Sequence, residues 1–341
     1  MKVIIQIPCY NEEDALPISL KELPRQLDGV DEVEWLIIND GSEDKTVEKA
    51  IKGGADYVIS HTNNLGLAQA FLSGMTAAIH FGADIIVNTD ADNQYCAKDI
   101  QKLIAPILNN RAEYVIGTRP VKDIRHWSPL KKNLQFFGSW VVRKAAQTNV
   151  VDAPSGFRAI KRAAAMRLHV FNRYTYTIET IIQAGHLKIP MLCIPVRTNK
   201  EIRPSRLMSG IPNYLKRSFS TIIRSFMAYD PLRFFLIPAT TFLAVTVILG
   251  MRYLYFFSIG EGKGHVQSLI LALALFVLST AFFIVGLLSD LIAVNRQILE
   301  GVDYRLRRLE AQKIENTSVE SEHEIIFNRA YLVFHRKQIN S

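Results

Sequence analysis

Apolar and polar positions in the first third of the chain follow two alternating patterns. Short, almost wholly apolar runs, typical of strands buried on both faces, lie at residues 3–7, 35–38, 57–59, 85–88 and 114–116. Segments with apolar residues three or four positions apart, typical of helices, lie between them at residues 43–52, 67–81 and 97–108. This alternation predicts an α/β fold with a mostly parallel sheet and helices on both faces.

The pattern changes in the middle of the chain. Residues 118–199 are mixed, with a helix-like stretch at 134–146, and we expect this region to complete a site on the sheet. Residues 211–229 place apolar side chains on one side of a predicted helix and Lys216, Arg217 and Arg224 on the other. An amphipathic helix of this kind suits a membrane surface.

Two long apolar stretches follow, and both predict transmembrane helices. Residues 234–257 contain Arg252 as their one charge and residues 266–289 contain none. At about 1.5 Å per residue, each is long enough to cross a hydrocarbon core of about 30 Å. The eight residues between them, 258–265, allow only a turn, so the pair predicts a hairpin.

The charges around the hairpin predict its orientation. Arginines flank it, at Arg217, Arg224, Arg233, Arg296, Arg305, Arg307 and Arg308. The turn holds only Lys263 and His265, so the positive-inside rule places both termini in the cytoplasm. The N-terminal residues do not have the pattern of a signal peptide, and we expect an integral membrane protein with a cytoplasmic catalytic domain. The hairpin could also pair with a second copy of the chain, a hypothesis that the sequence leaves open.

These patterns divide the chain into four parts. We predict a catalytic domain at residues 1–207, an amphipathic juxtamembrane helix at 208–231, two transmembrane helices within 232–294, and a cytoplasmic tail at 295–341. The formal net charge of +8 is explained by basic residues beside anionic lipid, so a nucleic acid partner is not needed. Cys9, Cys96 and Cys193 are too scattered for a disulfide framework or a zinc site.

The sharpest chemical feature is a pair of carboxylates, Asp90 and Asp92, directly after the apolar run 85–88. Two carboxylates at the end of a buried strand repel each other unless a cation bridges them. Carboxylate and amide oxygens are ligands for Mg²⁺ or Mn²⁺, and such a cation would also hold a diphosphate. The alternative is a capping turn, with Asp92 starting the helix near Ala97.

Three further polar turns follow predicted strands. They are residues 8–13, residues 39–42 and residues 64–66, and each alone is an ordinary connection between a strand and a helix. Because ligands bind beyond the carboxyl ends of parallel strands, the turns jointly predict a nucleotide cleft. Asp40 can accept hydrogen bonds from a base or ribose, and a glycine at a helix start, Gly66, lets backbone N–H groups approach phosphate.

The ordered set PxYNE, (N)DGS, NxG and DADxQ resembles glycosyltransferase family 2 over roughly residues 2–207. The match is most similar to polyprenyl-phosphate glycosyltransferases of the dolichyl-phosphate mannose synthase kind and to bacterial two-helix glucosyltransferases acting on undecaprenyl phosphate. The resemblance implies a GT-A (Rossmann-like) fold and a metal held by Asp90, Asp92 and Gln94. It implies nucleotide-sugar binding by Pro8, Tyr10, Asn11, Glu12, Asp40, Asn64, Gly66, Asp90, Ala91 and Asp92.

The resemblance extends to an acceptor site. The segment 152–158 is similar to the family's D-x-x-SGFR element, which implies that Asp152 and Arg158 lie near the acceptor and act with Asp92 in catalysis. Acceptor-phosphate contacts are implied for Arg119, Ser155, Arg158, Arg197 and Arg206. Arginine suits this task because its planar fork binds anions with paired hydrogen bonds, although each arginine could instead form a salt bridge or contact the membrane.

Together these features predict an inverting, metal-dependent transfer of one sugar from a UDP- or GDP-linked donor to a polyprenyl phosphate. A phosphate monoester is mostly dianionic at neutral pH, so a general base is less necessary and Asp152 would orient the acceptor. The main alternative is transfer to a hydroxyl of a lipid headgroup or glycan. A nucleotidyltransferase and a non-catalytic membrane scaffold are further alternatives. The expected partners are a nucleotide sugar, polyprenyl phosphate and membrane lipid.

Overall fold

The computed structural model describes residues 1–120, 138–144, 146–170, 175–199, isolated positions between 220 and 229, and residues 230–316. Arg206, most of the predicted amphipathic helix and the end of the predicted tail lie outside the described residues. The chain divides into two compact units, one of Met1–Ile222 with Asp303–Ser341 and one of Ile223–Val302. Each unit is considered by itself below.

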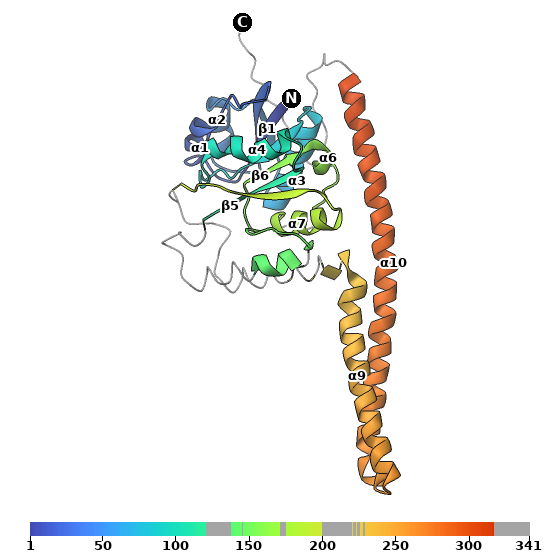
Figure 1. Cartoon of the computed structure of the whole chain (residues 1–341). Coiled ribbons are helices and arrows are strands. Elements are labelled where there is room, and N and C mark those ends of the chain that lie inside the picture. The colour runs from blue at the N-terminus through green and yellow to red at the C-terminus, as the bar shows by residue number, and fades with distance from the viewer. Residues whose placement is uncertain are drawn as a thin grey trace. The chain divides into compact units, whose positions relative to one another are not determined.

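The first unit is built on a sheet of seven described strands in the order β3-β2-β1-β4-β6-β5-β7 (Figure 1). The strands are β1 (Lys2–Cys9), β2 (Glu32–Asn39), β3 (Tyr57–Ser60), β4 (Ile85–Asn88), β5 (Tyr114–Thr118), β6 (Arg158–Lys161) and β7 (Met191–Pro195). β6 runs antiparallel to β4 and β5, and the other pairings are parallel. The predicted, mostly parallel sheet is confirmed, and its five predicted strands are β1 to β5.

Helices cover both faces of this sheet, as Figure 1 shows. They are α1 (Leu16–Glu22), α2 (Thr46–Lys52), α3 (Leu67–His80), η1 (Ala97–Asp99), α4 (Ile100–Leu108), α6 (Arg162–Ala165) and α7 (Thr177–His186). Residues 138–144, inside the stretch predicted as helix-like, are helical too. α2 begins three residues later than predicted because the Asp44 carboxylate accepts a hydrogen bond from the backbone N–H of Thr46 (3.0 Å) and holds the preceding residues in a turn.

The core explains why these strands are so uniformly apolar. Successive side chains of a strand point to opposite faces, and both faces of a parallel sheet are covered. In β1, Val3, Ile5 and Ile7 join a cluster with Leu103 and Ile107 of α4 on one face. The residues between them, such as Ile4, are equally buried on the other face, which α3 covers. Burial on both sides makes the strand ends at the sheet edge rigid supports for a site.

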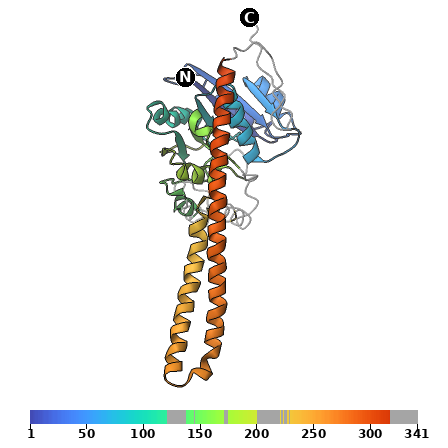
Figure 2. The same ribbon diagram turned by 90° about the vertical axis from the view of Figure 1, so that its right-hand side faces the viewer.

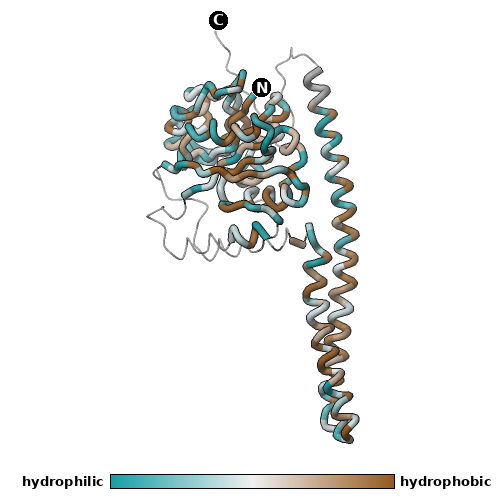
Figure 3. Tube along the Cα trace, in the orientation of Figure 1, coloured by the Kyte–Doolittle hydropathy of each residue, from teal (hydrophilic) through white to brown (hydrophobic). Residues whose placement is uncertain are grey.

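The second unit contains a helical hairpin of α9 (Pro231–Ser258) and α10 (Val266–Asn316), joined at η2 (Gly262–His265), and the residues of α10 from Asp303 on belong to the first unit. α9 and α10 lie side by side in both Figure 1 and Figure 2. Each contains a stretch long and apolar enough to cross a membrane. Figure 3 shows hydrophobic residues along α9 and the adjoining part of α10, and more hydrophilic residues farther along α10. α10 continues to Asn316, so the first part of the predicted tail is helical.

Small residues of α10 let the two helices approach closely. Ala272, Ser279 and Gly286 recur at intervals of seven residues and are buried. The Ser279 hydroxyl donates to the backbone oxygen of Ala239 (2.7 Å), and a Cβ at Gly286 would lie 3.1 Å from the Cβ of Phe235. Small side chains and interhelical hydrogen bonds are the usual means of helix packing in membranes, where lipid competes for apolar contacts.

This packing predicts different outcomes for two glycine substitutions. Gly286→Leu should destabilise the hairpin by about 1–3 kcal/mol, because the larger side chain forces the helices apart. Gly250→Leu is the matched control, since a Cβ at Gly250 meets nothing within 4 Å. Thermal unfolding of the full chain in detergent should show a lower transition temperature for Gly286→Leu alone. Equal transition temperatures for the two variants would contradict this packing of α9 against α10.

Candidate active site

The polar turns predicted from the sequence meet at one edge of the sheet. β1 and β2 are in register at their ends, where Cys9 pairs with Asn39, and β4 is in register with β1, where Asn88 pairs with Gln6. The chain beyond each strand therefore emerges at the same edge, together with Ser60 at the end of β3. This is the edge at which open α/β sheets bind ligands.

The turns after β1 and β2 are locked together by hydrogen bonds. The Asn11 N–H donates to the Ser42 hydroxyl (2.9 Å), and the Asn11 side-chain oxygen accepts from the Glu43 N–H (3.0 Å). Asn11 has a φ of 54°, a left-handed conformation that asparagine tolerates better than most residues. The Glu12 N–H donates to the Thr46 hydroxyl (2.8 Å). Asn11 and Glu12 therefore fix the conformation of the turns at this edge of the sheet.

Two predicted nucleotide-binding residues of the first turn differ in exposure. Pro8 lies inside β1, where it is buried and in register with Ile38. Contact between Pro8 and a nucleotide stays a prediction. Tyr10, by contrast, is 41% exposed at the sheet edge and stays a predicted contact for the donor.

Asp40 holds the turn after β3 in place through several hydrogen bonds. Its carboxylate accepts hydrogen bonds from the backbone N–H groups of Leu65 and Gly66, both at 2.9 Å, and lies 2.7 Å from His61 Nδ1. The N–H of Gly66 itself is bound by Asp40, and the approach of other backbone N–H groups at this helix start to a phosphate stays a prediction. Direct contact between Asp40 and a nucleotide stays a prediction, as does the role of Asn64, which is exposed on this turn.

His61 is a residue of this edge that the sequence analysis missed. It is 4% exposed, and its Nε2 lies 3.0 Å from the Ser73 hydroxyl of α3. It thus connects Asp40 to the helix that follows the turn. The available signal was its position directly after β3, at the same edge as the other polar turns.

The turn after β4 carries the predicted metal ligands. The Asp92 carboxylate accepts a hydrogen bond from the Gln94 N–H (3.1 Å), and the Ala91 oxygen accepts one from the Ser19 hydroxyl of α1 (2.7 Å). A Cβ built on Gly156 would lie 2.9 Å from both carboxylate oxygens of Asp90. The Asp90 side chain therefore rests directly against the Gly156 backbone, and the absence of a side chain there makes room for it.

The electrostatics of Asp90 favour a cation at this turn. Burial, with the neighbouring negative charges of Asp92 and Glu12, raises the pKa of Asp90 to about 7, although Arg119 and Arg158 act in the opposite direction. A divalent cation would relieve this repulsion. Among the described residues no three His, Cys, Asp or Glu side chains form a metal cluster, but Mg²⁺ bound with phosphates commonly uses only one or two carboxylates. Asp90 and Asp92 fit that chemistry.

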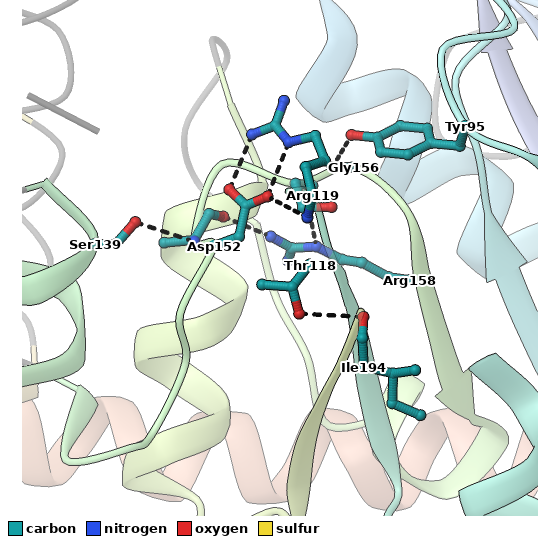
Figure 4. A network of polar contacts seen from close by, with 10 residues as sticks. Tyr95, Thr118, Arg119, Ser139, Asp152, Gly156, Arg158 and Ile194 are labelled. Carbon is teal, nitrogen blue, oxygen red and sulfur yellow. Dashed lines mark hydrogen bonds and ion pairs between the residues drawn. The ribbon is translucent and has the colours of Figure 1, made fainter. Parts of the chain in front are cut away.

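Arg119 and Asp152 form an ion pair, shown in Figure 4. The charge of Arg119 also lowers the pKa of Asp90. Arg119 Nε and Nη2 donate to the two oxygens of Asp152 at 2.8 and 2.9 Å, and the Arg119 backbone N–H donates at 3.1 Å. The Asp152 side chain is only 2% exposed. Its carboxylate is therefore engaged in fixing Arg119, and a direct catalytic role for Asp152 stays a prediction.

Arg158 does not occupy the place that the sequence analysis expected. It is wholly buried, and its five N–H groups are directed at oxygen atoms of the protein interior: those of Ser155, Tyr114, Thr180, Ala153 and Thr177. The structure therefore corrects its predicted role as a catalytic and phosphate-binding residue, because no donor is left for a ligand. Arg158 supports the loop above β6 and contributes positive charge near Asp90.

The other predicted acceptor residues are spread out. Ser155 is 0% exposed, and its contact with a phosphate stays a prediction. The Arg197 side chain is 60% exposed and donates to both oxygens of the buried Asp99, at the start of α4. Its contact with an acceptor stays a prediction. Arg206 lies outside the described residues.

Comparison with known proteins identifies the chain at this point. The family model for glycosyl transferase family 2 matches residues 4–174. The chain belongs to this family. It is therefore a glycosyltransferase, and the sheet edge described above lies largely within the matched region.

Two relatives of this glycosyltransferase have names that include a lipid phosphate. A UDP-N-acetylglucosamine–dolichyl-phosphate N-acetylglucosaminyltransferase of Methanococcus voltae is 30% identical over 218 residues, covering 58% of this chain and 85% of the relative. An undecaprenyl-phosphate mannosyltransferase of Micrococcus luteus is 27% identical over 222 residues, covering 62% of this chain and 89% of the relative.

A solved structure agrees in fold. Glucosyl-3-phosphoglycerate synthase from Mycobacterium tuberculosis, in complex with Mn²⁺, UDP and glucosyl-3-phosphoglycerate, superposes with a TM-score of 0.52 at 18% identity. The match covers 67% of this chain and 79% of that chain. At this identity the likeness shows the GT-A fold alone.

The raised pKa of Asp90 predicts a pH-dependent stability of the metal-free protein. An unfolded aspartate has a pKa of about 4, so folded Asp90, with a pKa of about 7, keeps its proton over a pH range in which the unfolded chain has lost it. The wild type should lose stability as the pH rises from about 4 to about 7. Asp90→Asn lacks this loss, so its stability advantage should widen between pH 5 and pH 8 in thermal unfolding with a chelator. An advantage that is constant with pH would contradict the assignment.

Proposed function

We propose that this family 2 glycosyltransferase transfers one sugar from a nucleotide sugar to a polyprenyl phosphate, with inversion at the anomeric carbon and with a divalent cation. The observation that carries the proposal is the buried Asp90 carboxylate with Asp92 as its negative neighbour, a pair that a divalent cation would stabilise, in a chain that also contains two helices long and apolar enough to span a membrane. The names of the two relatives support the lipid-phosphate acceptor.

Asp90 and Asp92 would hold Mg²⁺ or Mn²⁺, with Gln94 as the third predicted ligand. When bound, the ion would neutralise the charge that develops on the departing nucleoside diphosphate. Two backbone contacts position the Asp90 carboxylate for this task. The Ala91 oxygen is held by a hydrogen bond to α1, and the Gly156 backbone lies against the Asp90 carboxylate. The Mn²⁺ and UDP in the structural neighbour support a divalent ion and a diphosphate donor in this fold.

The acceptor chemistry requires little proton transfer. An oxygen of the lipid phosphate attacks the anomeric carbon, a new carbon–oxygen bond forms, and the bond to the nucleoside diphosphate breaks on the opposite face. Because the phosphate is already mostly dianionic, no general base is needed. Arg119, held by Asp152 next to Asp90, supplies positive charge where two anionic groups must meet.

Membrane anchoring by the hairpin would keep the enzyme close to its lipid acceptor. A polyprenyl chain resides in the bilayer, and a glycosyltransferase anchored in the same membrane meets the lipid phosphate at a raised effective concentration. We propose the topology inferred from the basic residues, with the catalytic domain and both termini in the cytoplasm. We likewise propose the four-part division of the chain, with the juxtamembrane segment at residues 208–231 lying on the membrane surface.

Product analysis tests the proposal. The purified full chain would be given UDP- and GDP-linked sugars, Mg²⁺ or Mn²⁺, and either a polyprenyl phosphate or the corresponding polyprenol. We expect transfer to the phosphate alone, loss of transfer with a chelator, and a loss of about 100-fold or more in Asp92→Ala. Asp28→Ala, which removes an exposed carboxylate beyond α1, is the matched control and should retain activity.

Two results would contradict this function. Transfer to a phosphate-free acceptor at an equal rate would show a hydroxyl-directed enzyme. Release of pyrophosphate in place of a nucleoside diphosphate would show nucleotidyl transfer.

A further inference from the structure

A chain of buried polar side chains lies directly behind the Asp90 turn. Asn88 is the last residue of β4, and its side-chain nitrogen donates to the Gly156 oxygen and to the Tyr176 hydroxyl, both at 2.8 Å. Its side-chain oxygen accepts a hydrogen bond from Gln6 of β1 (2.9 Å). We call Gln6, Asn88 and Tyr176 the interior network. None of the three side chains belongs to a sequence motif of the family resemblance.

The interior network occupies a place where apolar side chains would suffice for folding. Gln6 and Tyr176 are 0% exposed and Asn88 is 1% exposed, and the neighbouring residues of β4 are apolar. Buried amides are costly unless their hydrogen bonds are made. Both polar atoms of the Asn88 amide are bonded, whereas the Gln6 side-chain oxygen has no partner among the described residues. The bonded groups around Asn88 rigidify their surroundings. The network therefore indicates a demand for fixed geometry at this point of the sheet.

The fixed geometry is that of the Gly156 peptide. Its oxygen accepts from Asn88 and lies 3.4 Å from the Tyr176 hydroxyl, while its N–H donates to the Tyr95 hydroxyl at 3.1 Å. The Tyr176 ring is held in turn by stacking on Phe71, with ring centroids 3.7 Å apart and planes inclined by 4°. Both polar groups of Gly156 are thus bound to side chains that cannot move freely.

The fixed position of the Gly156 peptide also restricts the Asp90 carboxylate. A Cβ on Gly156 would approach both Asp90 carboxylate oxygens to 2.9 Å, so the carboxylate and the Gly156 backbone are already in close contact. A small shift of the Gly156 peptide would therefore displace the Asp90 carboxylate or leave a gap behind it. The path runs from the interior network through Gly156 to Asp90.

We propose that Asn88 and Tyr176 are positioning residues that hold Gly156 against Asp90 and so fix the Asp90 carboxylate for binding a divalent ion together with the donor diphosphate. The inference rests on the proposed function of Asp90. It goes further in assigning part of the affinity for the ion to side chains that touch neither ion nor substrate. Such supporting residues typically contribute about 10- to 100-fold to metal affinity.

Two substitutions test the positioning role in the full chain. Asn88→Ala removes the link to Gly156, and Tyr176→Phe removes only the hydroxyl while keeping the ring on Phe71. Each should raise the Mn²⁺ concentration for half-maximal sugar transfer about tenfold. The matched control is Tyr57→Phe, which removes a mostly buried hydroxyl that donates to Glu34 (3.2 Å) at the start of β3. It should keep the wild-type Mn²⁺ requirement.

A double substitution separates positioning from general destabilisation. Mn²⁺ binding in the presence of UDP is measured for Tyr176→Phe, Asp90→Asn and the combined variant. If Tyr176 acts through Asp90, its substitution should weaken binding in the wild-type background and have little effect in Asp90→Asn, because coupled residues are not additive. A purely structural role predicts a lower unfolding temperature with an unchanged Mn²⁺ requirement.

The outcomes distinguish this inference from the function on which it rests. If the wild type shows no metal-dependent transfer, the proposed function fails. If the wild type is metal-dependent and Tyr176→Phe requires no more Mn²⁺ than Tyr57→Phe, the positioning role alone is overturned. Tyr176→Phe also decides the question if Asn88→Ala does not fold.

Discussion

The repulsion between Asp90 and Asp92 is the constraint around which the catalytic unit is organised. Two carboxylates at the end of a buried strand would ordinarily separate or take up a proton, and burial beside Asp92 raises the pKa of Asp90 accordingly. The fold prevents separation, because Gly156 lies against one side of Asp90 and the backbone of Ala91 is bound to α1. Besides a proton, a divalent cation would stabilise the ionised pair, and a diphosphate leaving group requires such a cation as well.

Arginines predicted to bind the acceptor divide into those that support the protein interior and those that keep an exposed side chain. Arg158 is committed to the interior by its five donors, although it stands in a segment that resembles an acceptor motif. Arg197 keeps most of its side chain exposed while paired with Asp99. A sequence motif indicates that a residue is important. It does not show whether the side chain contacts the substrate or instead supports the backbone of residues that contact it.

The sequence predicted the parts of the fold that depend on local patterns. β1 to β5 each contain a short, mostly apolar run, and the turns that follow them meet at one edge because parallel strands share a direction. β6 was missed because it begins and ends with a charged residue, Arg158 and Lys161, and is defined by antiparallel partners far away in the chain. α10 outlasts its predicted span because hydropathy marks only the apolar part of a helix, whereas its hydrogen bonds continue into charged sequence.

The candidate site was predictable to a lesser degree. The Asp90 and Asp92 pair and the turn at Asn11 could be found, because carboxylates and turn formers after a strand carry a recognisable pattern. The contact between Asn88 and Tyr176 spans 88 residues of sequence and leaves no local trace. The occupation of the Gly66 N–H by Asp40 is equally invisible without coordinates.

A structure of the full chain with Mn²⁺ and a nucleoside diphosphate would show whether Asp90 and Asp92 hold the ion. We expect anomalous scattering from one Mn²⁺ ion bound by the Asp90 and Asp92 carboxylates and by the diphosphate. A diphosphate bound at this edge with Mn²⁺ elsewhere, or with Asp90 and Asp92 turned away from the ion, would contradict it.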